Sequence, residues 1–444
     1  MGQKRIYIET FGCQMNVADS ERAATSLRAQ GYELTESSES ADVVIFNTCS
    51  VREKAEQKVF HRIKDIKKQN SEKFPIIGIM GCVAQLMGPA LLESDHSLKM
   101  VIGTGATDRI PRLLKHIADT NEQIIDLHGR EESDIWDAST TDRHSKYIGF
   151  VPIIEGCNKF CTYCIVPYSR GRERSRIALD VICEGQNLLA NGYKEIQLIG
   201  QNVNSYRPHS DIGLQGFAGA TAFSKLLRAI SSTGLPRIKF TTSFPRDFHD
   251  DIVSAIEENE NLCNWIHLPV QSGNNRILRA MRRGYKAEEY IKCVETIKNS
   301  RRRISLTSDI IVGFPGETEK EFEDTMKLIE QCQFDGLYIF KYSERRGTPA
   351  AKLNDTVTSD EKTRRFLSLE KLQMSIQNKL YNSYVGSTVS VLVEGLSARS
   401  SEDLTGHTTC NKVVNFKGNS NLIGKIVNVC ISEAKAHSLY GRLI

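Results

Sequence analysis

The chain has 444 residues, of which 40% are hydrophobic and 25% charged, with a formal net charge of +4 and twelve cysteines. This length predicts two or three domains in a globular protein. The start, MGQKRIYIET, has no apolar signal region, and no apolar run reaches the roughly twenty residues that cross a bilayer. We therefore expect a cytoplasmic protein without membrane contact, whose cysteines serve metal or redox chemistry instead of disulfides.

Strand-like and helical segments alternate over the first 125 residues. The apolar runs are RIYIET, DVVIFNT, PIIGIM and KMVIGT, and amphipathic segments separate them. This alternation predicts a parallel sheet in a Rossmann-like α/β domain over residues 1–125. One cysteine follows each of the first three runs, at the strand ends where open α/β sheets place ligands. These cysteines, Cys13, Cys49 and Cys82, are expected to converge on one crevice.

A polar linker is expected at 126–142, and a second alternating series fills 143–375. Its six strand-like runs are FVPIIEG, EIQLIGQN, RIKFTTS, WIHLPVQ, ISLTSDIIVGF and DGLYIFKYS. They predict a partial (β/α)6 barrel, with its chemistry at the C-terminal ends of the strands. The segments TEKE (Thr318 to Glu321) and TSDE (Thr358 to Glu361) predict the starts of two helices. From 376 to 444 the short runs rich in Val, Thr and Gly predict a small antiparallel β-barrel.

The segment EGCNKFCTYC carries a CxxxCxxC motif directly after the first strand of the second series. Cys157, Cys161 and Cys164 can hold three irons of a four-iron cluster, which leaves the fourth iron open to a small molecule. Tyr163 places an aromatic ring beside it. A structural zinc loop is the alternative, but zinc requires four ligands and no fourth cysteine or histidine has a suitable spacing nearby.

This motif, on the first strand of a six-fold β/α series, resembles that of the radical S-adenosylmethionine (SAM) superfamily. The resemblance implies that the open iron binds SAM, which is cleaved to methionine and a 5′-deoxyadenosyl radical. LIGQNVNSY, HLPVQSGNN and DIIVGFPGE resemble the cofactor-binding turns of that superfamily, although GQN stands where Gly-Gly-Glu is usual. The implied SAM contacts are Tyr163, Gly200, Gln201, Asn202, Gln271, Ser272, Asp309 and Glu317.

The three separated N-terminal cysteines favour a second three-cysteine [4Fe–4S] cluster. The alternative is that each is an ordinary buried cysteine, which is common for one residue but less so for three equivalent strand ends. The whole chain then resembles the methylthiotransferase family, whose C-terminal barrel is the RNA-binding TRAM module. The resemblance implies that the second cluster supplies sulfur and that a second SAM supplies the methyl group.

TFGCQMNVADSE and NTCSVREKAEQKVF resemble the branch that acts on N6-isopentenyladenosine next to the anticodon of tRNA. The other branches modify a ribosomal-protein aspartate or threonylcarbamoyl-adenosine, and a zinc-stabilised RNA-binding protein is the non-enzymatic alternative. GHTTCNKVVNF resembles the GRTxTN turn of this branch, with His407 and Cys410 in place of Arg and Thr.

Partners follow from the same resemblance. We expect a tRNA carrying isopentenyladenosine, an electron donor such as flavodoxin or ferredoxin, and a monomeric chain. Three basic residues after the CxxxCxxC motif are candidates for contacts with RNA phosphates, and structural salt bridges explain them equally well. These residues are Arg170, Arg172 and Arg174.

Overall fold

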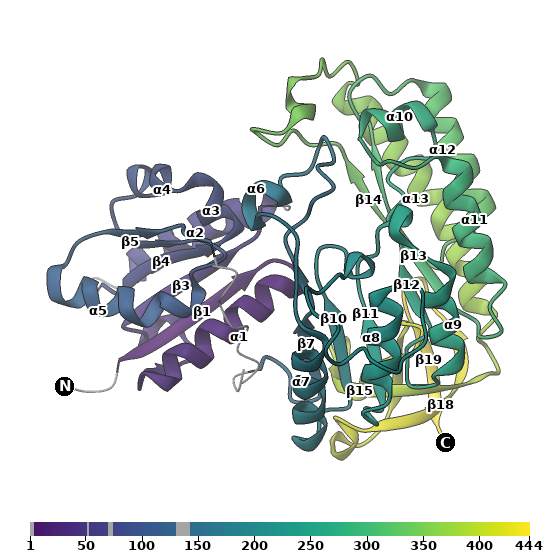
Figure 1. Cartoon of the computed structure of the whole chain (residues 1–444), viewed down its shortest axis with the longest axis horizontal. Helices are drawn as coiled ribbons and strands as arrows, with labels where there is room; N and C mark the ends of the chain where they lie inside the picture. The colour runs from purple at the N-terminus through teal and green to yellow at the C-terminus, as the bar shows by residue number, and fades with distance from the viewer. Residues whose placement is uncertain (1–3, 51–52, 70–73, 130–142) are drawn as a thin grey trace. The chain divides into compact units, whose positions relative to one another are not determined.

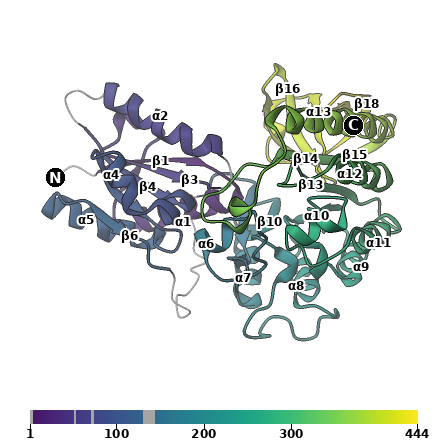
Figure 2. The same cartoon turned by 90° about the horizontal axis from the view of Figure 1, so that it is seen from above.

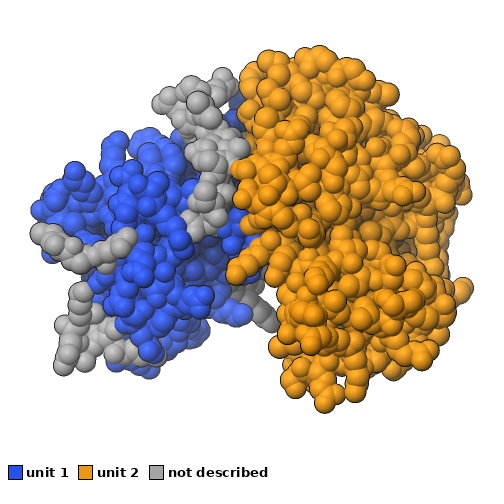
Figure 3. Space-filling view, turned by 90° about the horizontal axis from the view of Figure 1, so that it is seen from below, with its two compact units in different colours: residues 1–145, 155–158, 165–174 blue, residues 146–154, 159–164, 175–444 orange. Residues whose placement is uncertain are grey.

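The computed structural model describes residues 4–50, 53–69, 74–129 and 143–444. The chain forms two compact units, which Figure 3 shows in blue and orange. The first unit comprises residues 1–145, 155–158 and 165–174, and the second comprises 146–154, 159–164 and 175–444. The linker expected at 126–142 falls largely outside the described residues, and the three-domain division stays a prediction. No helix in the described ranges has both the length and the apolarity to span a membrane.

The first unit is built on a six-stranded parallel sheet with the order β2-β1-β3-β4-β5-β6. Its strands are β1 (Arg5–Phe11), β2 (Glu33–Leu34), β3 (Val43–Thr48), β4 (Ile76–Gly81), β5 (Leu98–Ile102) and β6 (Ile124–Asp126). The helices are α1 (Gln14–Ala29), α2 (Glu53–Gln69), α3 (Cys82–Met87), α4 (Pro89–Ser94), α5 (Ile110–Thr120) and α6 (Val166–Arg170).

Both faces of this sheet are buried, as its continuous apolar runs require. In β3, Val43 and Ile45 pack into the core under α1 and α5, whereas Val44 and Phe46 pack into the core under α2. Figure 2 shows α2 on one side of the strands and α5 on the other. The Rossmann-like arrangement expected for this part of the chain is confirmed.

The second unit contains six parallel strands in two sheets, with the orders β11-β10-β7 and β12-β13-β14. An isolated parallel bridge pairs Ile238 of β11 with Leu262, which precedes β12. The strands are β7 (Ile148–Pro152), β10 (Glu195–Ile199), β11 (Arg237–Phe240), β12 (Trp265–His267), β13 (Ser305–Val312) and β14 (Gly336–Lys341). Two short strands, β8 (Ile154–Glu155) and β9 (Arg174–Ser175), pair separately. Among the described residues no pairing joins β7 to β14, so the six strands form the expected partial barrel.

Helices cover the outside of the partial barrel and bury one large apolar core against its strands. They are α7 (Ala178–Ala190), α8 (Ala222–Ser231), α9 (Asp250–Glu258), α10 (Asn275–Ala280), α11 (Ala287–Lys298), α12 (Glu319–Cys332) and α13 (Ser359–Asn382). Two helix starts predicted from the sequence are confirmed. Thr318 caps α12 and Thr358 caps α13, each accepting a hydrogen bond from the backbone N–H three residues ahead.

The C-terminal strands close into a barrel with the order β15-β16-β17-β19-β18, drawn in yellow-green to yellow in Figure 1. They are β15 (Thr388–Ser397), β16 (Ser400–Thr408), β17 (Val413–Lys417), β18 (Ile426–Ala434) and β19 (Leu439–Leu443). Four of the five pairings are antiparallel and the β17–β19 pairing is parallel. A closed ring of five strands cannot alternate direction throughout, so the predicted antiparallel barrel must contain one such pair.

The turn that resembles GRTxTN attaches this small barrel to the partial barrel within the second unit. Arg237, the first residue of β11, donates from Nη1 to the carbonyl of His407 at 2.9 Å and from Nη2 to the carbonyl of Ser390 at 2.8 Å. Lys412 Nζ lies 2.6 Å from Asp335 Oδ1 and 3.3 Å from the hydroxyl of Ser305, the first residue of β13. The turn therefore docks at the N-terminal ends of the partial-barrel strands, opposite the ends where chemistry is expected.

His407 lies between two carboxylates in this contact between the small barrel and the partial barrel. Its Nε2 lies 2.8 Å from Glu195 Oε2, and its Nδ1 contacts Glu394. Burial lowers the pKa of His407, but Glu195 outweighs it and raises the pKa overall. His407 in turn overcomes the effect of burial and lowers the pKa of Glu195 to about 2. Because both ring nitrogens face carboxylates, His407 is an imidazolium in the dock. Lys239 is the nearby cation that opposes this charge.

We expect the thermal stability of the second unit to fall as pH rises above about 6.5, the usual pKa of histidine. The His407 contribution is complete below its unfolded pKa of about 6.5 and is lost through its higher folded pKa. The Glu195 contribution is complete above its unfolded pKa of about 4.5 and is lost as pH falls toward about 2. His407→Gln should lower stability by about 3 kcal/mol at pH 6 and remove the alkaline loss. Calorimetry at pH 6 and at successively higher pH values checks this, with exposed His209→Gln as the control. If His407→Gln lost stability with rising pH as steeply as the parent protein does, this prediction would be wrong.

Candidate functional site

Three cysteines of the first unit follow the C-terminal ends of adjacent parallel strands, and these ends are in register with one another. β1, β3 and β4 are neighbours in the sheet, and their registers pair Phe11 with Thr48 and Thr48 with Gly81. Cys49 and Cys82 come directly after Thr48 and Gly81, and Cys13 comes two residues after Phe11. The backbone N–H of Cys49 also donates to the carbonyl of Phe11 at 3.0 Å. The fold therefore places all three at one edge of the sheet, as their spacing predicts.

The local backbone directs these cysteines into the edge of the sheet. Cys13 is the N-cap of α1, so its sulfur lies at the positive end of a sixteen-residue helix. A hydrogen bond from Cys49 lowers the pKa of the Cys13 thiol to about 5, against the effect of burial. Asn16 accepts from Cys13 Sγ at 3.3 Å and donates to Asn47 at 2.9 Å. Gly81 has a φ of 95°, and a Cβ there would meet Asn47 at 2.4 Å. This environment favours a thiolate at Cys13.

A buried arginine supplies the positive charge at this edge of the first unit. The side chain of Arg170, at the end of α6, is 2% exposed; its Nη2 donates to Asp19 at 2.7 Å and its Nη1 to Glu155 at 3.3 Å. Burial alone would lower the pKa of Arg170, but Asp19, Cys82, Glu155 and Cys13 raise it well above its usual value. The guanidinium is therefore paired with two carboxylates and also interacts electrostatically with two thiols of the cysteine site, which the sequence pattern did not reveal.

The three basic residues after the CxxxCxxC motif consequently differ in what they can contact. Arg170 is enclosed by protein, so the salt-bridge interpretation replaces the expected RNA contact for this residue. Arg174 is partly exposed and lies 4.0 Å from Glu155. Arg172 is exposed, as a contact with RNA phosphate requires.

The CxxxCxxC loop is braced at both ends. Cys157 belongs to the first unit, where its N–H donates to the carbonyl of Gly171 at 3.1 Å. Gly156 before it has a φ of 79°, and a Cβ there would lie 2.1 Å from the carbonyl of Arg172. Cys161 and Cys164 belong to the second unit, where the Cys164 N–H donates to the Cys161 carbonyl at 3.0 Å. The short spacing holds the three sulfurs on one loop.

Contacts with the end of α10 hold the part of this loop that lies in the second unit. Thr162 donates from its N–H to the carbonyl of Met281 at 3.1 Å and from its hydroxyl to the carbonyl of Ala280 at 2.9 Å. The Tyr163 hydroxyl accepts from Arg283 at 3.3 Å, and burial raises the pKa of that hydroxyl. Tyr163 is thus a partly buried partner of Arg283, a residue that the sequence motifs did not single out.

After β10, the backbone of Gly200 packs closely against Ile154, and the side-chain oxygen of Gln201 accepts no hydrogen bond from the described residues. A Cβ at Gly200 would meet the Ile154 side chain at 2.3 Å, so only glycine fits. Gln201 Oε1 is buried without a hydrogen-bond partner in the described part of the chain, and Asn202 beside it is buried. A buried polar atom without a partner at a strand end indicates a place for a ligand.

Backbone strain marks two further strand ends of the partial barrel. Gln271, after β12, has a φ of 77°, and its N–H donates to the carbonyl of Asp309 at 2.9 Å. Thr242, after β11, has a φ of 68°, which a β-branched residue rarely adopts. The hydroxyl of its neighbour, Ser243, is buried and has no partner among the described residues. Thr242 and Ser243 were missed in the sequence because no motif marks them. Strain of this kind clusters at ligand sites.

The other expected SAM contacts divide into available and enclosed residues. Asp309 is partly exposed and lies 3.4 Å from His267. Ser272 is fully buried, and its hydroxyl lies 3.4 Å from the Thr325 hydroxyl. Ser272 therefore braces the loop after β12, whereas Asp309 remains accessible to a ligand.

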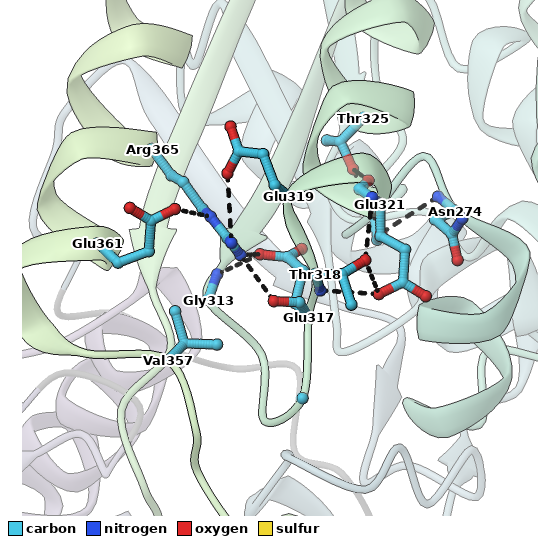
Figure 4. A network of polar contacts seen from close by, with 12 residues as sticks. Asn274, Gly313, Glu317, Thr318, Glu319, Glu321, Thr325, Val357, Glu361 and Arg365 are labelled. Atoms are coloured by element: carbon cyan, nitrogen blue, oxygen red, sulfur yellow. Dashed lines mark hydrogen bonds and ion pairs between the residues drawn. The ribbon is translucent and has the colours of Figure 1, made fainter.

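Glu317 is also enclosed, as Figure 4 shows. Its carboxylate accepts from the Gly313 N–H at 2.7 Å and from Arg365 Nη1 at 2.8 Å, and its side chain is 1% exposed. Arg365 additionally contacts Glu361, at the start of α13, at 2.8 Å. In the structure Glu317 ties the loop after β13 to α13, and its contact with SAM stays a prediction.

The side chains at these positions decide whether the iron–sulfur clusters and the SAM expected from the sequence fit the structure. Within the described ranges, no three Cys, His, Asp or Glu side chains stand close enough together to hold a metal ion as they are oriented. The backbone, however, places three thiols at one sheet edge and three on one short loop, and thiolates are the ligands of iron–sulfur clusters. The partnerless oxygens of Gln201 and Ser243 fit a polar ligand such as SAM. The residues therefore fit both groups.

Comparisons with known proteins agree with this arrangement. Family models match residues 5–103 (uncharacterized protein family UPF0004), 151–329 (radical SAM superfamily) and 382–444 (TRAM domain). The fold resembles that of the radical SAM methyltransferase TsrM from Kitasatospora setae, with a TM-score of 0.58, 14% identity and coverage of 79% of this chain and 74% of that one.

Full-length relatives share much more of the sequence. The Koribacter versatilis protein named tRNA-2-methylthio-N(6)-dimethylallyladenosine synthase is 42% identical to this chain, over 99% of this chain and 98% of the relative. The protein of that name in Carboxydothermus hydrogenoformans is 42% identical over the full length of both chains. The chain therefore belongs to the radical SAM family of tRNA-2-methylthio-N(6)-dimethylallyladenosine synthases.

Proposed function

We propose that this protein adds a methylthio group to C2 of N6-isopentenyladenosine next to the anticodon of tRNA. The observation that carries the proposal is the pair of three-cysteine sites in one chain. One lies at the ends of three adjacent strands, and the other lies on the loop that follows the first partial-barrel strand. The full-length relatives supply the name of the reaction.

The reaction requires a radical because the C2–H bond has no acidic proton that a side chain can remove. Cys157, Cys161 and Cys164 would hold a [4Fe–4S] cluster whose fourth iron binds SAM. When bound, this pair supplies the 5′-deoxyadenosyl radical, which no side chain can generate. The protein contributes the site around it. Gln201 and Ser243 offer polar atoms to SAM at the strand ends, and the loop contacts of Thr162 keep the thiolates in place.

The N-terminal cysteines would hold a second [4Fe–4S] cluster, which supplies the sulfur, while a second SAM molecule supplies the methyl group. Arg170 places a buried positive charge near this site, where it is paired with Asp19 and Glu155. Arg170 also links the two sites along the chain. It pairs with Glu155, two residues before Cys157, and interacts electrostatically with Cys13 and Cys82. The residues around Cys157 are thereby fixed to the sulfur-donating site within the first unit.

The remaining partners are proposed from the same chemistry. A one-electron donor such as flavodoxin or ferredoxin would reduce the radical cluster, and the monomer would bind isopentenylated tRNA in the cytoplasm. Arg172 is exposed and available to an RNA phosphate, and the C-terminal barrel matches a TRAM domain. The GRTxTN-like turn is enclosed in the dock, so RNA would meet another face of that barrel.

A deletion strain tests the substrate. We expect its tRNA to retain isopentenyladenosine and to lose the methylthio derivative, as measured by mass spectrometry of the nucleosides. The matched control is the same strain carrying the gene on a plasmid, in which the methylthio nucleoside returns. Loss of a ribosomal-protein modification with unchanged nucleosides would assign the chain to a sister reaction. An anaerobically purified protein with zinc and no acid-labile sulfide would contradict the radical mechanism altogether.

A further inference from the structure

Arg283 lies in the turn after α10, and the surrounding backbone directs its side chain inward. The residue is 5% exposed, whereas its neighbour Arg282 is exposed. Arg282 and Gly284 have positive φ angles of 56° and 70°. A non-glycine residue in this region costs roughly 1–2 kcal/mol, so the turn accepts strain at Arg282. The backbone on both sides thus holds Arg283 in a defined place.

All three nitrogens of the Arg283 guanidinium have partners in the second unit. Nη1 donates to Cys161 Sγ and to the Tyr163 hydroxyl, both at 3.3 Å. Nη2 donates to the carbonyl of Pro269 at 2.9 Å, and Nε donates to the Tyr285 hydroxyl at 2.9 Å. The guanidinium is therefore fixed on one side by the segment after β12 and on the other by the CxxxCxxC loop.

The charge of Arg283 has no carboxylate partner among the described residues. Its acceptors there are a carbonyl, two phenol oxygens and a thiol. A buried cation is costly unless an anion lies nearby. The ring centroid of Phe244 lies 4.5 Å from the guanidinium carbon and compensates only part of that cost. A thiolate at Cys161 is the anion that the geometry offers.

We propose that Arg283 is a positioning residue of the CxxxCxxC site that also favours the reduced state of the cluster held there. One electron from an external one-electron donor enters the cluster, and no bond forms or breaks in that step. A hydrogen bond from a cation to a ligating sulfur stabilises the added negative charge and raises the reduction potential. This inference rests on the proposed function only in requiring a cluster on Cys157, Cys161 and Cys164.

The test uses the full-length chain with the three N-terminal cysteines changed to alanine, so that only one cluster assembles. Arg283→Gln removes the cation and Arg283→Lys keeps it without the planar fork. Arg279→Gln, on the exposed face of α10, is the matched control. Each protein is reconstituted with iron and sulfide and titrated with dithionite and mediators, without tRNA. The reduced cluster is followed by electron paramagnetic resonance, and iron is counted in each sample.

In Arg283→Gln, we expect the ratio of reduced to oxidised cluster at a fixed potential to fall about tenfold, a shift of about 59 mV for one electron. Arg283→Lys should shift less, and Arg279→Gln should not shift. An unchanged potential with full iron content in Arg283→Gln would overturn the proposal. If Arg283→Gln holds no cluster, the lysine variant decides, and an unchanged potential there, or loss of its cluster too, also overturns it. A parent protein without any cluster would instead contradict the proposed function.

Discussion

Replacing Cys161 by alanine is expected to lower 5′-deoxyadenosine formation from SAM by more than about a hundredfold. Changing only an outer partner of a metal ligand costs 10–100-fold, and Cys161 would itself be a ligand. The residue is buried on a loop segment that Thr162 and Arg283 hold in place within the second unit. The measurement is anaerobic chromatography of 5′-deoxyadenosine after addition of dithionite and SAM.

The matched control for Cys161→Ala is Cys183→Ala, because Cys183 is an exposed cysteine on α7 outside both sites. Cys183→Ala should form 5′-deoxyadenosine at the parental rate. Cys161→Ala should lose about four irons per chain, the content of one cluster, and keep the other cluster. Parental formation of 5′-deoxyadenosine by Cys161→Ala would show that SAM is not cleaved at this loop.

The replacement Cys49→Ala is expected to separate the two halves of the reaction. The Cys49 side chain lies against Cys13, and its backbone pairs with the end of β1, so its loss opens the N-terminal site. Methylthiolated tRNA should fall by more than about a hundredfold, for the same reason as above. The CxxxCxxC loop is unchanged, so 5′-deoxyadenosine formation should persist. Parallel assays of both products in one reaction check this result.

Buried Cys263 provides a control for removing a thiol from the protein interior. Burial raises its pKa to about 12, so Cys263 is a thiol in the second unit and not a ligand candidate. Cys263→Ala should keep both products, apart from a modest loss of stability. If Cys49→Ala methylthiolated tRNA at the parental rate, the role given to Cys49 would be wrong. If Cys49→Ala lost both products, the two sites would not be separable in function.

Much of the fold, and the placement of three cysteines at one edge of the N-terminal sheet, could be predicted because the signals are local in the sequence. Each N-terminal cysteine follows an apolar run, and parallel strands bring their C-terminal ends to one edge. The starts of α12 and α13 follow from capping residues within four positions of each other. In such cases a short stretch of sequence contains both the interacting groups and the geometry that joins them.

The arginines show why the rest could not be predicted. Arg170 pairs with Asp19 from 151 positions away, and Arg283 meets Cys161 from 122 positions away. Each was one of several arginines in a basic stretch, and only the packed chain decides which of them turns inward. Arg170 is thus tied to Asp19 and Glu317 to Arg365, contacts that no motif in the sequence contains.

The most direct test of the account is anaerobic turnover of the reconstituted protein with isopentenylated tRNA, SAM and a one-electron donor, followed by mass analysis of the digested nucleosides. The account predicts that a methylthio group appears on isopentenyladenosine, together with 5′-deoxyadenosine, and that tRNA lacking the isopentenyl group is not modified. A protein that holds both clusters and cleaves SAM yet leaves isopentenyladenosine unchanged would contradict it.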